Sequence, residues 1–342
     1  MAKIKQFADT SAVALSYAID DAPNASEMTA TELKRIPYTS EGFQLSKESQ
    51  TSTAITKDRR ISGSKNTRGS ASGSATVEFG HTPFVKDMLS LALMGEWQAG
   101  DTGEEFITDS DKLNFFVVEK RVRNTVGGAP MNYMERYFGN LVNEATLEVG
   151  SSELVTFAVN TMAAFGDINS ADATSDENAG GLVATYTNPA AYEIADSANN
   201  IEKVVIKDAQ GTPLEIVFSD LSLSVTNNVR EQVGVGHEFA AGMAMGKVNV
   251  QLSGTVYFYD DTVLKAHLNN EYVSAEITVA TSDGTMTIML PKLKAEAPSA
   301  NSQGENQDYT QSLTLNGEKG EVTIGTTTPQ TLECVIAITK TV

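Results

Sequence analysis

The chain has 342 residues, of which 41% are hydrophobic and 20% are charged, a composition typical of a folded globular protein with room for two domains. Its formal net charge of −19 argues against a general nucleic-acid binder, because affinity for phosphate is built from Lys and Arg, but it suits a surface that DNA passes without adhering. A single cysteine excludes an internal disulfide framework. The sequence contains no run of about 18 apolar residues, which is the signal of a membrane-spanning helix.

The N-terminal residues 1–40 mix small and polar types, and we expect them to form an arm that docks elsewhere. They begin MAKIKQFADTSAVALSYAID, which lacks the uninterrupted apolar core of a signal peptide, so we expect synthesis in the cytoplasm without membrane insertion. A first domain is expected over residues 41–165. It opens with a strand from Gly42, in which Phe43 and Leu45 share one face.

A basic loop follows this strand in ITKDRRISGSKNTRG, Ile55 to Gly69, where five cations and one aspartate give a local charge of +4 (5 − 1). Its cations are Lys57, Arg59, Arg60, Lys65 and Arg68. The loop has no aromatic residue and no helix to present to a groove, which disfavours DNA binding. We favour a contact with an acidic surface of another copy of the chain, because complementary charge fixes the register between subunits.

The next stretch, Gly69 to Trp97, predicts a strand, a capped turn and a helix. Small and apolar residues alternate with polar ones along the strand, the pattern of a half-buried strand. The inward set is Ala71, Gly73, Ala75, Val77 and Phe79. Thr82 is placed to cap the helix, and Pro83 suits its first position, where a missing N–H costs nothing. An apolar stripe on the helix consists of Phe84, Val85, Met88 and Leu89.

The same pattern returns at Lys247 to Tyr272, shifted by 179 positions (250 − 71 = 179), with Asp261 at the place of Thr82. We interpret this as an internal duplication in which each copy has a helix packed on its own sheet. The candidate helix-on-sheet core is Val77, Phe79, Phe84, Val85, Met88, Leu89, Val256, Phe258, Val263, Leu264 and Leu268. The second domain is expected over residues 213–318.

The remaining segments fit around these two copies. Strong strands are expected from Leu113 to Val122 and in the two segments after it, and a hairpin is expected around Asp283-Gly284. Residues 166–212 are expected to form an acidic linker and a hairpin, and residues 319–342 to add C-terminal strands without a counterpart in the first half.

No constellation for catalysis or metal binding is apparent in the sequence. The three histidines, His81, His237 and His267, lack ligand spacing, and no P-loop, G-x-S-x-G or H-E-x-x-H motif occurs. Cys334 alternates with apolar residues and is interpreted as a buried strand thiol. We therefore expect no cofactor and no enzymatic activity, and a protein that works through its surfaces.

The polar faces of the two matched strands are the candidate functional surface. Amphipathic strands of this kind can close into a ring when copies join edge to edge, which removes exposed edges. The candidate lumen-facing residues are Ser70, Ser72, Ser74, Thr76, Glu78, Asn249, Gln251, Ser253 and Thr255.

Taken together, GFQLSKESQT, TKDRRISGSKNTRG, SASGSATVEFG, TPFVKDMLSLALMGEW and SGTVYFYDDTVLKAHLN resemble the major tail tube protein of long-tailed bacteriophages. The resemblance spans roughly residues 41–318. It implies mainly β structure, with two tandem β-sandwich or split-barrel domains, each flanked by a helix. It also implies protomers in rings that stack into a tube conducting the genome within the virion.

With two domains per chain, the expected ring is a homotrimer with pseudo-sixfold symmetry, in which domain one of one chain abuts domain two of the next. By position, the loop from Lys57 to Arg68 corresponds to the one that reaches a neighbouring ring in this family. The expected partners are further copies of the chain, a tape-measure protein, tail-tip and terminator proteins, and DNA in transit.

Two alternatives remain open from the residues. One is another virion or surface protein of repeated β domains, such as a capsid decoration protein or adhesin. The other is a carbohydrate-acting β-sandwich enzyme, which is disfavoured because Trp97 alone offers a large sugar-stacking platform.

Overall fold

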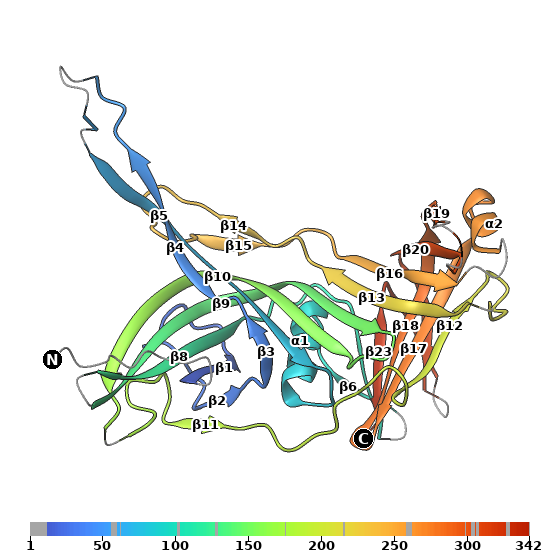
Figure 1. Ribbon diagram of the computed structural model, residues 1–342, viewed down its shortest axis with the longest axis horizontal. Helices are drawn as coiled ribbons and strands as arrows, with labels where there is room; N and C mark the ends of the chain where they lie inside the picture. The colour runs from blue at the N-terminus through green and yellow to red at the C-terminus, as the bar shows by residue number, and fades with distance from the viewer. Residues whose placement is uncertain are drawn as a thin grey trace.

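The computed structural model describes residues 12–341 except 56–59, 62, 101–102, 127–128, 175, 215, 258–261, 298, 302–304, 306–307 and 326–328. The protein is mainly β, as expected, and its long strands form one curved sheet that runs through both halves of the molecule (Figure 1). None of the helices in this described part of the chain is long and apolar enough to cross a membrane.

The first half is built on one long sheet, in the order β11-β2-β1-β8-β9-β10-β5-β4, with β3 also paired to β5. Its elements are β1 (Val13–Ile19), β2 (Glu32–Arg35), β3 (Tyr38–Glu41), β4 (Gln44–Thr51), β5 (Ser64–Glu78), α1 (Pro83–Leu93), β6 (Gln98–Ala99), β7 (Glu105–Thr108), β8 (Phe116–Val126), β9 (Ala129–Gly150), β10 (Thr156–Asp172) and β11 (Thr185–Thr187). All pairings are antiparallel except β2 with β11, which is parallel.

The second half has the strand order β12-β17-β18-β20-β16-β13. Its elements are β12 (Ile201–Lys207), β13 (Phe218–Thr226), β14 (Arg230–Gln232), β15 (Gly242–Ala244), β16 (Asn249–Tyr257), α2 (Thr262–Leu268), β17 (Tyr272–Thr281), β18 (Gly284–Ala295), β19 (Ser299–Asn301), β20 (Thr310–Gly317), β21 (Gly320–Ile324), β22 (Gln330–Cys334) and β23 (Ala337–Thr341). Strand β19 continues the line of β18 along β20.

Two expectations about segments outside the repeats need correction. The described part of residues 1–40 is not a detached arm, because β1 pairs with β8 along its whole length and buries Leu15 and Tyr17. In residues 166–212 the expected hairpin is present, with Lys207 bridging Pro213, but the start of the expected linker belongs to β10, which runs to Asp172, and β12 pairs with β17. The C-terminal strand β23 links the two halves, pairing with β18 on one side and β7 on the other.

Helix α1 forms as its local sequence predicts. The Val85 N–H donates to Thr82 Oγ1 at 3.3 Å, Pro83 is its first residue, and the helix ends at Met94 in the left-handed conformation (φ 51°). Its predicted apolar stripe is buried together with Val77 of β5 and Phe79, the residue that follows β5. The helix contacts β9, β7 and β13, so it lies where the two halves meet.

Helix α2 does not pack as expected. It is a short helix beside β18, and its Leu264 and Leu268 are 40% and 71% exposed. The prediction that these two residues belong to the core is therefore wrong for a single copy of the chain. No described element covers α2 in the way that β13 and β7 cover α1. Phe258 and Asp261, and the side chain of Val263, lie outside the described residues.

The two halves share a strand order and detailed pairing. Tyr38 pairs with Val77, and Phe218 pairs with Val256, at shifts of 180 (218 − 38) and 179 (256 − 77). In each pair of strands the next residue, Thr39 or Ser219, is left out of the register. Its hydroxyl makes the same hydrogen bond in both halves: Thr39 Oγ1 donates to the Thr76 carbonyl, and Ser219 Oγ donates to the Thr255 carbonyl. The internal duplication stays a prediction, and these shared pairings support it.

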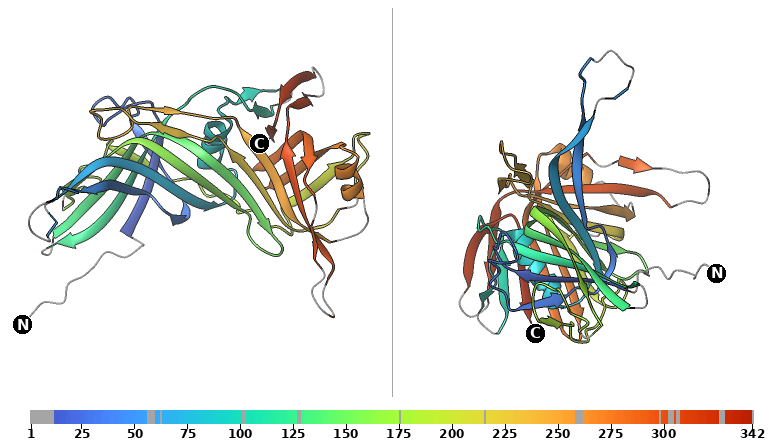
Figure 2. Two further views of the ribbon diagram at one scale, coloured as in Figure 1. Left: turned by 90° about the horizontal axis from the view of Figure 1, so that it is seen from above. Right: turned by 90° about the vertical axis from the view of Figure 1, so that its left-hand side faces the viewer.

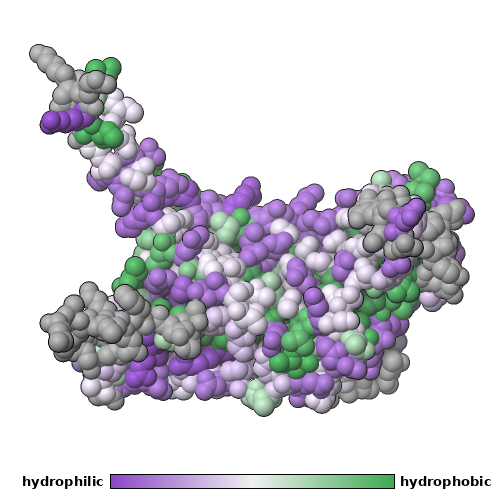
Figure 3. Space-filling model, viewed as in Figure 1, coloured by the Kyte–Doolittle hydropathy of each residue, from purple (hydrophilic) through white to green (hydrophobic). Residues whose placement is uncertain are grey.

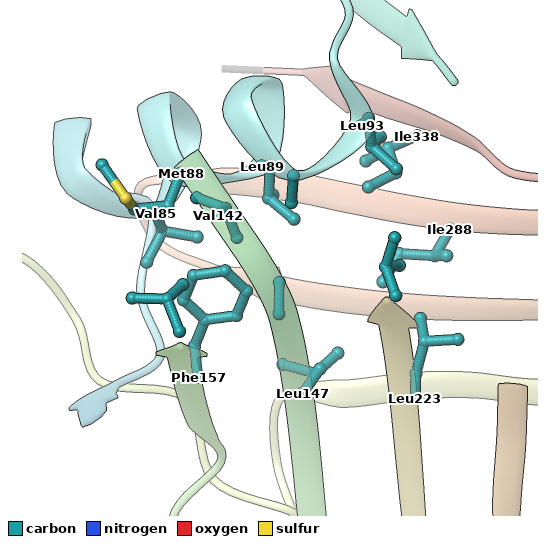
Figure 4. Packing of buried hydrophobic residues seen from close by; sticks show 14 of the residues in the cluster. Val85, Met88, Leu89, Leu93, Val142, Leu147, Phe157, Leu223, Ile288 and Ile338 are labelled. Carbon is teal, nitrogen blue, oxygen red and sulfur yellow. The ribbon is translucent and has the colours of Figure 1, made fainter. Parts of the chain in front are cut away.

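The core of the molecule passes through both halves without a break. One row of paired residues crosses six strands, β5, β10, β9, β13, β16 and β20, and all six side chains are at most 5% exposed. The row is Val77, Phe157, Leu147, Leu223, Leu252 and Leu315. Leu89 and Leu93 of α1 and Ile288 and Ile338 of the second half converge on the same region (Figure 4).

Candidate lumen and assembly surfaces

The face of the sheet opposite this core is polar along its whole width. Residues that pair directly across antiparallel strands point to the same side. One row joins Thr76, Ala158, Thr146, Ser224, Gln251 and Asn316. The next joins Glu78, Thr156, Glu148, Ser222, Ser253 and Thr314. A third joins Ser74, Asn160, Glu144, Thr226 and Asn249. We call these three rows the polar face.

The structure brings the two halves of the sequence prediction onto this one surface. Glu78 and Ser253, predicted from separate strands, lie in the same row, and none of the nine candidate residues is buried. Ser70 and Ser72 continue the face along β5 toward β4, and Thr255 continues it along β16. Sequence reasoning missed the members from β9, β10, β13 and β20, although each of these strands shows the same alternation of polar and apolar residues.

Charge on the polar face is of one sign. Its three rows contain Glu78, Glu144 and Glu148 and no Lys or Arg. Asn160 Nδ2 donates to Glu144 at 2.9 Å, which is a neutral contact and leaves that charge uncompensated by a cation. The charged groups of these rows would repel phosphate groups brought to this face.

The predicted basic loop is the end of a long hairpin of β4 and β5, which we call the arm. The arm projects far beyond the rest of the molecule (Figures 1 and 2). Hydrophobic side chains sit near its end (Figure 3), where Ile55 is 100% exposed and Ile61 is 76% exposed. Lys57 and Arg59 lie outside the described residues, and Lys65 is exposed on β5.

One residue of the basic set does not act as predicted. Arg68 lies at the base of the arm and forms an ion pair with Glu231, in β14 of the same chain. Lys47 of β4 pairs similarly with Glu238 of the loop between β14 and β15. The Gly69 N–H also donates to the Glu238 carbonyl at 2.8 Å. The glycine-rich loop of the second half thus braces the arm of the first half, and Arg68 is not available to an acidic surface of another copy.

The acidic segment after β10 folds back under the first half. Its anchor is Glu119 of β8, which is 1% exposed and accepts from Arg121 Nη2 at 3.1 Å, the Tyr186 hydroxyl at 2.6 Å and the Leu182 N–H at 2.8 Å. Burial, followed by the Glu119 charge, raises the pKa of Tyr186. These hydrogen bonds hold the segment against β8, which gives the buried carboxylate a structural explanation.

The described residues hold no group of three or more His, Cys, Asp or Glu side chains that could bind a metal ion. His267 Nδ1 lies 2.8 Å from the Ala295 carbonyl, and His81 is half-buried beside Phe79. Burial and then the charge of Asp109 raise the pKa of Cys334 to about 12, so its thiol is a poor nucleophile at neutral pH.

A comparison with family models supplies the identification. The model described as "Phage tail tube protein" matches residues 10–318, which includes both halves of the sheet and the arm. A search of curated proteins finds no match to this chain. The amphipathic sheet, the match over most of the chain and the shared strand order agree with one another: the chain belongs to the phage tail tube protein family.

Proposed function

We propose that this chain is the repeating ring subunit of a phage tail tube, with three copies in each ring and the polar face lining the lumen. The coarser role, a structural tail protein of the virion that assembles into a tube, follows from the family. The trimeric ring, the lumen lining and the passage of DNA are the proposal. A tape-measure protein inside the tube, and tip and terminator proteins at its ends, are its proposed partners.

One observation carries the trimeric ring. Within the chain, β9 of the first half pairs with β13 of the second half, from Glu144↔Thr226 to Gly150↔Asp220, so the two domains already share one continuous sheet. If each domain occupies one of six positions in a ring, three chains contribute three such internal seams, and three equivalent seams form between neighbouring chains. A heterologous contact that repeats in this way closes a ring and leaves no sheet edge open.

The polar face supports the role of a conduit. A lumen of hydroxyl, amide and carboxylate groups offers DNA no apolar surface on which its bases can stack and no cation that binds its phosphates. Its charge has the sign of the phosphates and of the whole chain, which carries −19. The genome would pass along such a wall without adhering.

Electron microscopy and mass measurement of the purified chain test this proposal. We expect rings with a central hole, a particle mass of three chains (each 36.5 kDa), and tubes of stacked rings at high protein concentration. Monomers at every concentration and salt condition, or solid particles without a hole, would contradict it. A closed ring of six chains would contradict the proposed number of three chains per ring but would still support the proposal that the chain forms a tube.

A further inference from the structure

We propose that neighbouring chains join by adding residues 41–45 of one copy to the free edge of β19 of the next, and that Glu41 and Lys120 cap this joining edge until the partner strand binds. The proposal rests on the ring proposed above and names the surfaces that form it.

The register follows from pairings inside the chain. Thr156 pairs with Glu78 and Glu148, while Thr310 pairs with Tyr257 and Asn301. Strand β10 therefore corresponds to β20 at a shift of 154 (310 − 156), and β9 corresponds to β18 and β19 at a shift of 153 (301 − 148). The end of β9 that pairs with β13 thus has its counterpart in β19.

In a single copy of the chain, the two strand edges that correspond to the two sides of the internal seam are unpaired. Among the strands that the structure describes, β19 pairs only with β20, and β3 and β4 pair only with β5. In the internal seam Leu223 faces Leu147 and Ser224 faces Thr146. Applying the two shifts places Phe43 (223 − 180) opposite Ala300 (147 + 153), and Gln44 (224 − 180) opposite Ser299 (146 + 153).

Helix α2 supplies a second, independent observation. Its exposed Leu264 and Leu268 correspond to Val85 and Leu89 of α1 (264 − 179 = 85, 268 − 179 = 89), which are 0% and 8% exposed. Leu89 is covered from the side of β13, where it lies in one apolar cluster with Leu223. The next copy's β3 and β4, which occupy the place of β13, would cover α2 in the same way. Exposed leucines on α2 are thus explained by a missing second copy.

The backbone of the joining strand shows which groups have to pair. The Gly42 N–H donates to the Ser74 carbonyl of β5 at 2.9 Å, so the neighbouring Phe43 directs its backbone groups away from β5. These are the groups that would bond to Ala300. In the separate chain both are occupied: the Phe43 N–H donates to Glu41 Oε2 at 3.0 Å, and its carbonyl accepts from Lys120 Nζ at 3.3 Å.

The two capping side chains also bind each other, Lys120 Nζ to Glu41 Oε1 at 2.8 Å, and both are largely buried. Their counterparts at the internal seam are apolar and buried: Leu221 stands for Glu41 (221 − 41 = 180), and Ile277 stands for Lys120 (277 − 120 = 157). These two positions are apolar beside β13, whose edge is always paired within the chain, and charged beside residues 41–45, whose edge is free in a single copy. Charges beside a strand edge are a known protection against unwanted strand pairing.

Cross-linking tests the register. Gln44 and Ser299 would form a non-hydrogen-bonded antiparallel pair, whose Cα atoms lie about 4.5 Å apart, within reach of a disulfide. We expect the variant Gln44→Cys/Ser299→Cys to give covalent dimers and trimers when its rings are oxidised, reversed by reductant. The control Gln50→Cys/Ser299→Cys moves the thiol six positions along the same exposed strand, roughly 20 Å, and stays monomeric on a denaturing gel.

The variant Glu41→Leu/Lys120→Met removes the cap, because neither new side chain can bond to the Phe43 backbone, and leucine is the residue found at the counterpart of Glu41, Leu221. We expect it to form rings at a lower protein concentration than the parent chain, whereas Lys203→Met/Glu276→Gln, which breaks a 2.7 Å ion pair elsewhere, leaves that concentration unchanged. Circular dichroism confirms folding of both. Rings without the in-register cross-link would overturn the seam but not the tube. An unchanged or raised assembly concentration would overturn the cap, and a chain that forms no rings would count against the tube itself.

Discussion

At the scale of single residues, the six-strand apolar row explains why the two halves act as one body. Leu147 of β9 packs between Phe157 of its own half and Leu223 of the other. It is 5% exposed and lies beside Leu89 of α1. Removing its side chain therefore loosens both the first core and the seam.

Replacing Leu147 by alanine should lower the free energy of unfolding by about 2–5 kcal/mol, because a buried leucine loses its transfer energy and leaves a cavity. Urea denaturation followed by circular dichroism measures the change. Its neighbour Thr146 points to the polar face, so Thr146→Ala is the matched control and should change stability by less than about 0.5 kcal/mol. A larger loss for Thr146→Ala than for Leu147→Ala would mean that the assignment of the faces is inverted, and equal losses would contradict the difference between them.

At the scale of elements, the strands were more predictable from sequence than their partners. The alternation in β5 and β16, the Thr82 cap and the stripe on α1 are local signals, and the structure shows a strand, cap and buried helix where they stand. The joining of β9 to β13, and the role of β1 in the sheet, depend on contacts between segments far apart in the chain. No local pattern encodes them.

Helix α2 shows the same limit from the other side. Its leucines have the spacing of a core stripe, which predicts burial but does not say by which molecule. For the basic loop, the predicted contact with another copy of the chain was based on charge alone. Its Arg68 forms an ion pair inside the chain, while Ile55 and Ile61 are the exposed large hydrophobic residues in the described part of the arm's end.

The arm leads to a prediction about ring stacking. Ile55 is 100% exposed and Ile61 is 76% exposed at its end, and burying each against a neighbouring ring would be worth roughly 1.5–3 kcal/mol. The variant Ile55→Ser/Ile61→Ser should form normal rings but fewer and shorter tubes, as measured by electron microscopy. Val233→Ser/Val235→Ser, which alters two exposed valines of the bracing loop, is the control and should stack normally. Tubes of ordinary length from the isoleucine variant would exclude the arm's end as the stacking contact.

At the scale of the whole molecule, the chain separates its two faces by function. The apolar face is consumed by the core and by α1, and the polar face is left as a continuous surface across both domains. The three carboxylates of that face are repeated in every copy, so a ring of three would present nine to the lumen. In the proposed ring, the charge of the lumen would therefore come from the sheet itself, without an additional loop.

Reversing these charges tests the conduit directly. In the variant Glu78→Lys/Glu144→Lys/Glu148→Lys, DNA phosphates would meet cations in place of carboxylates. Short duplex DNA should therefore bind to assembled tubes with an affinity that falls steeply as salt rises. The control Glu27→Lys/Glu202→Lys/Glu321→Lys changes the net charge by the same amount at exposed positions outside the polar face. Co-sedimentation of labelled DNA with tubes measures both. Retention by the polar-face variant alone places these carboxylates along the path of the DNA, and equal retention by both variants would show that net charge governs binding and that the polar face is not the lumen wall.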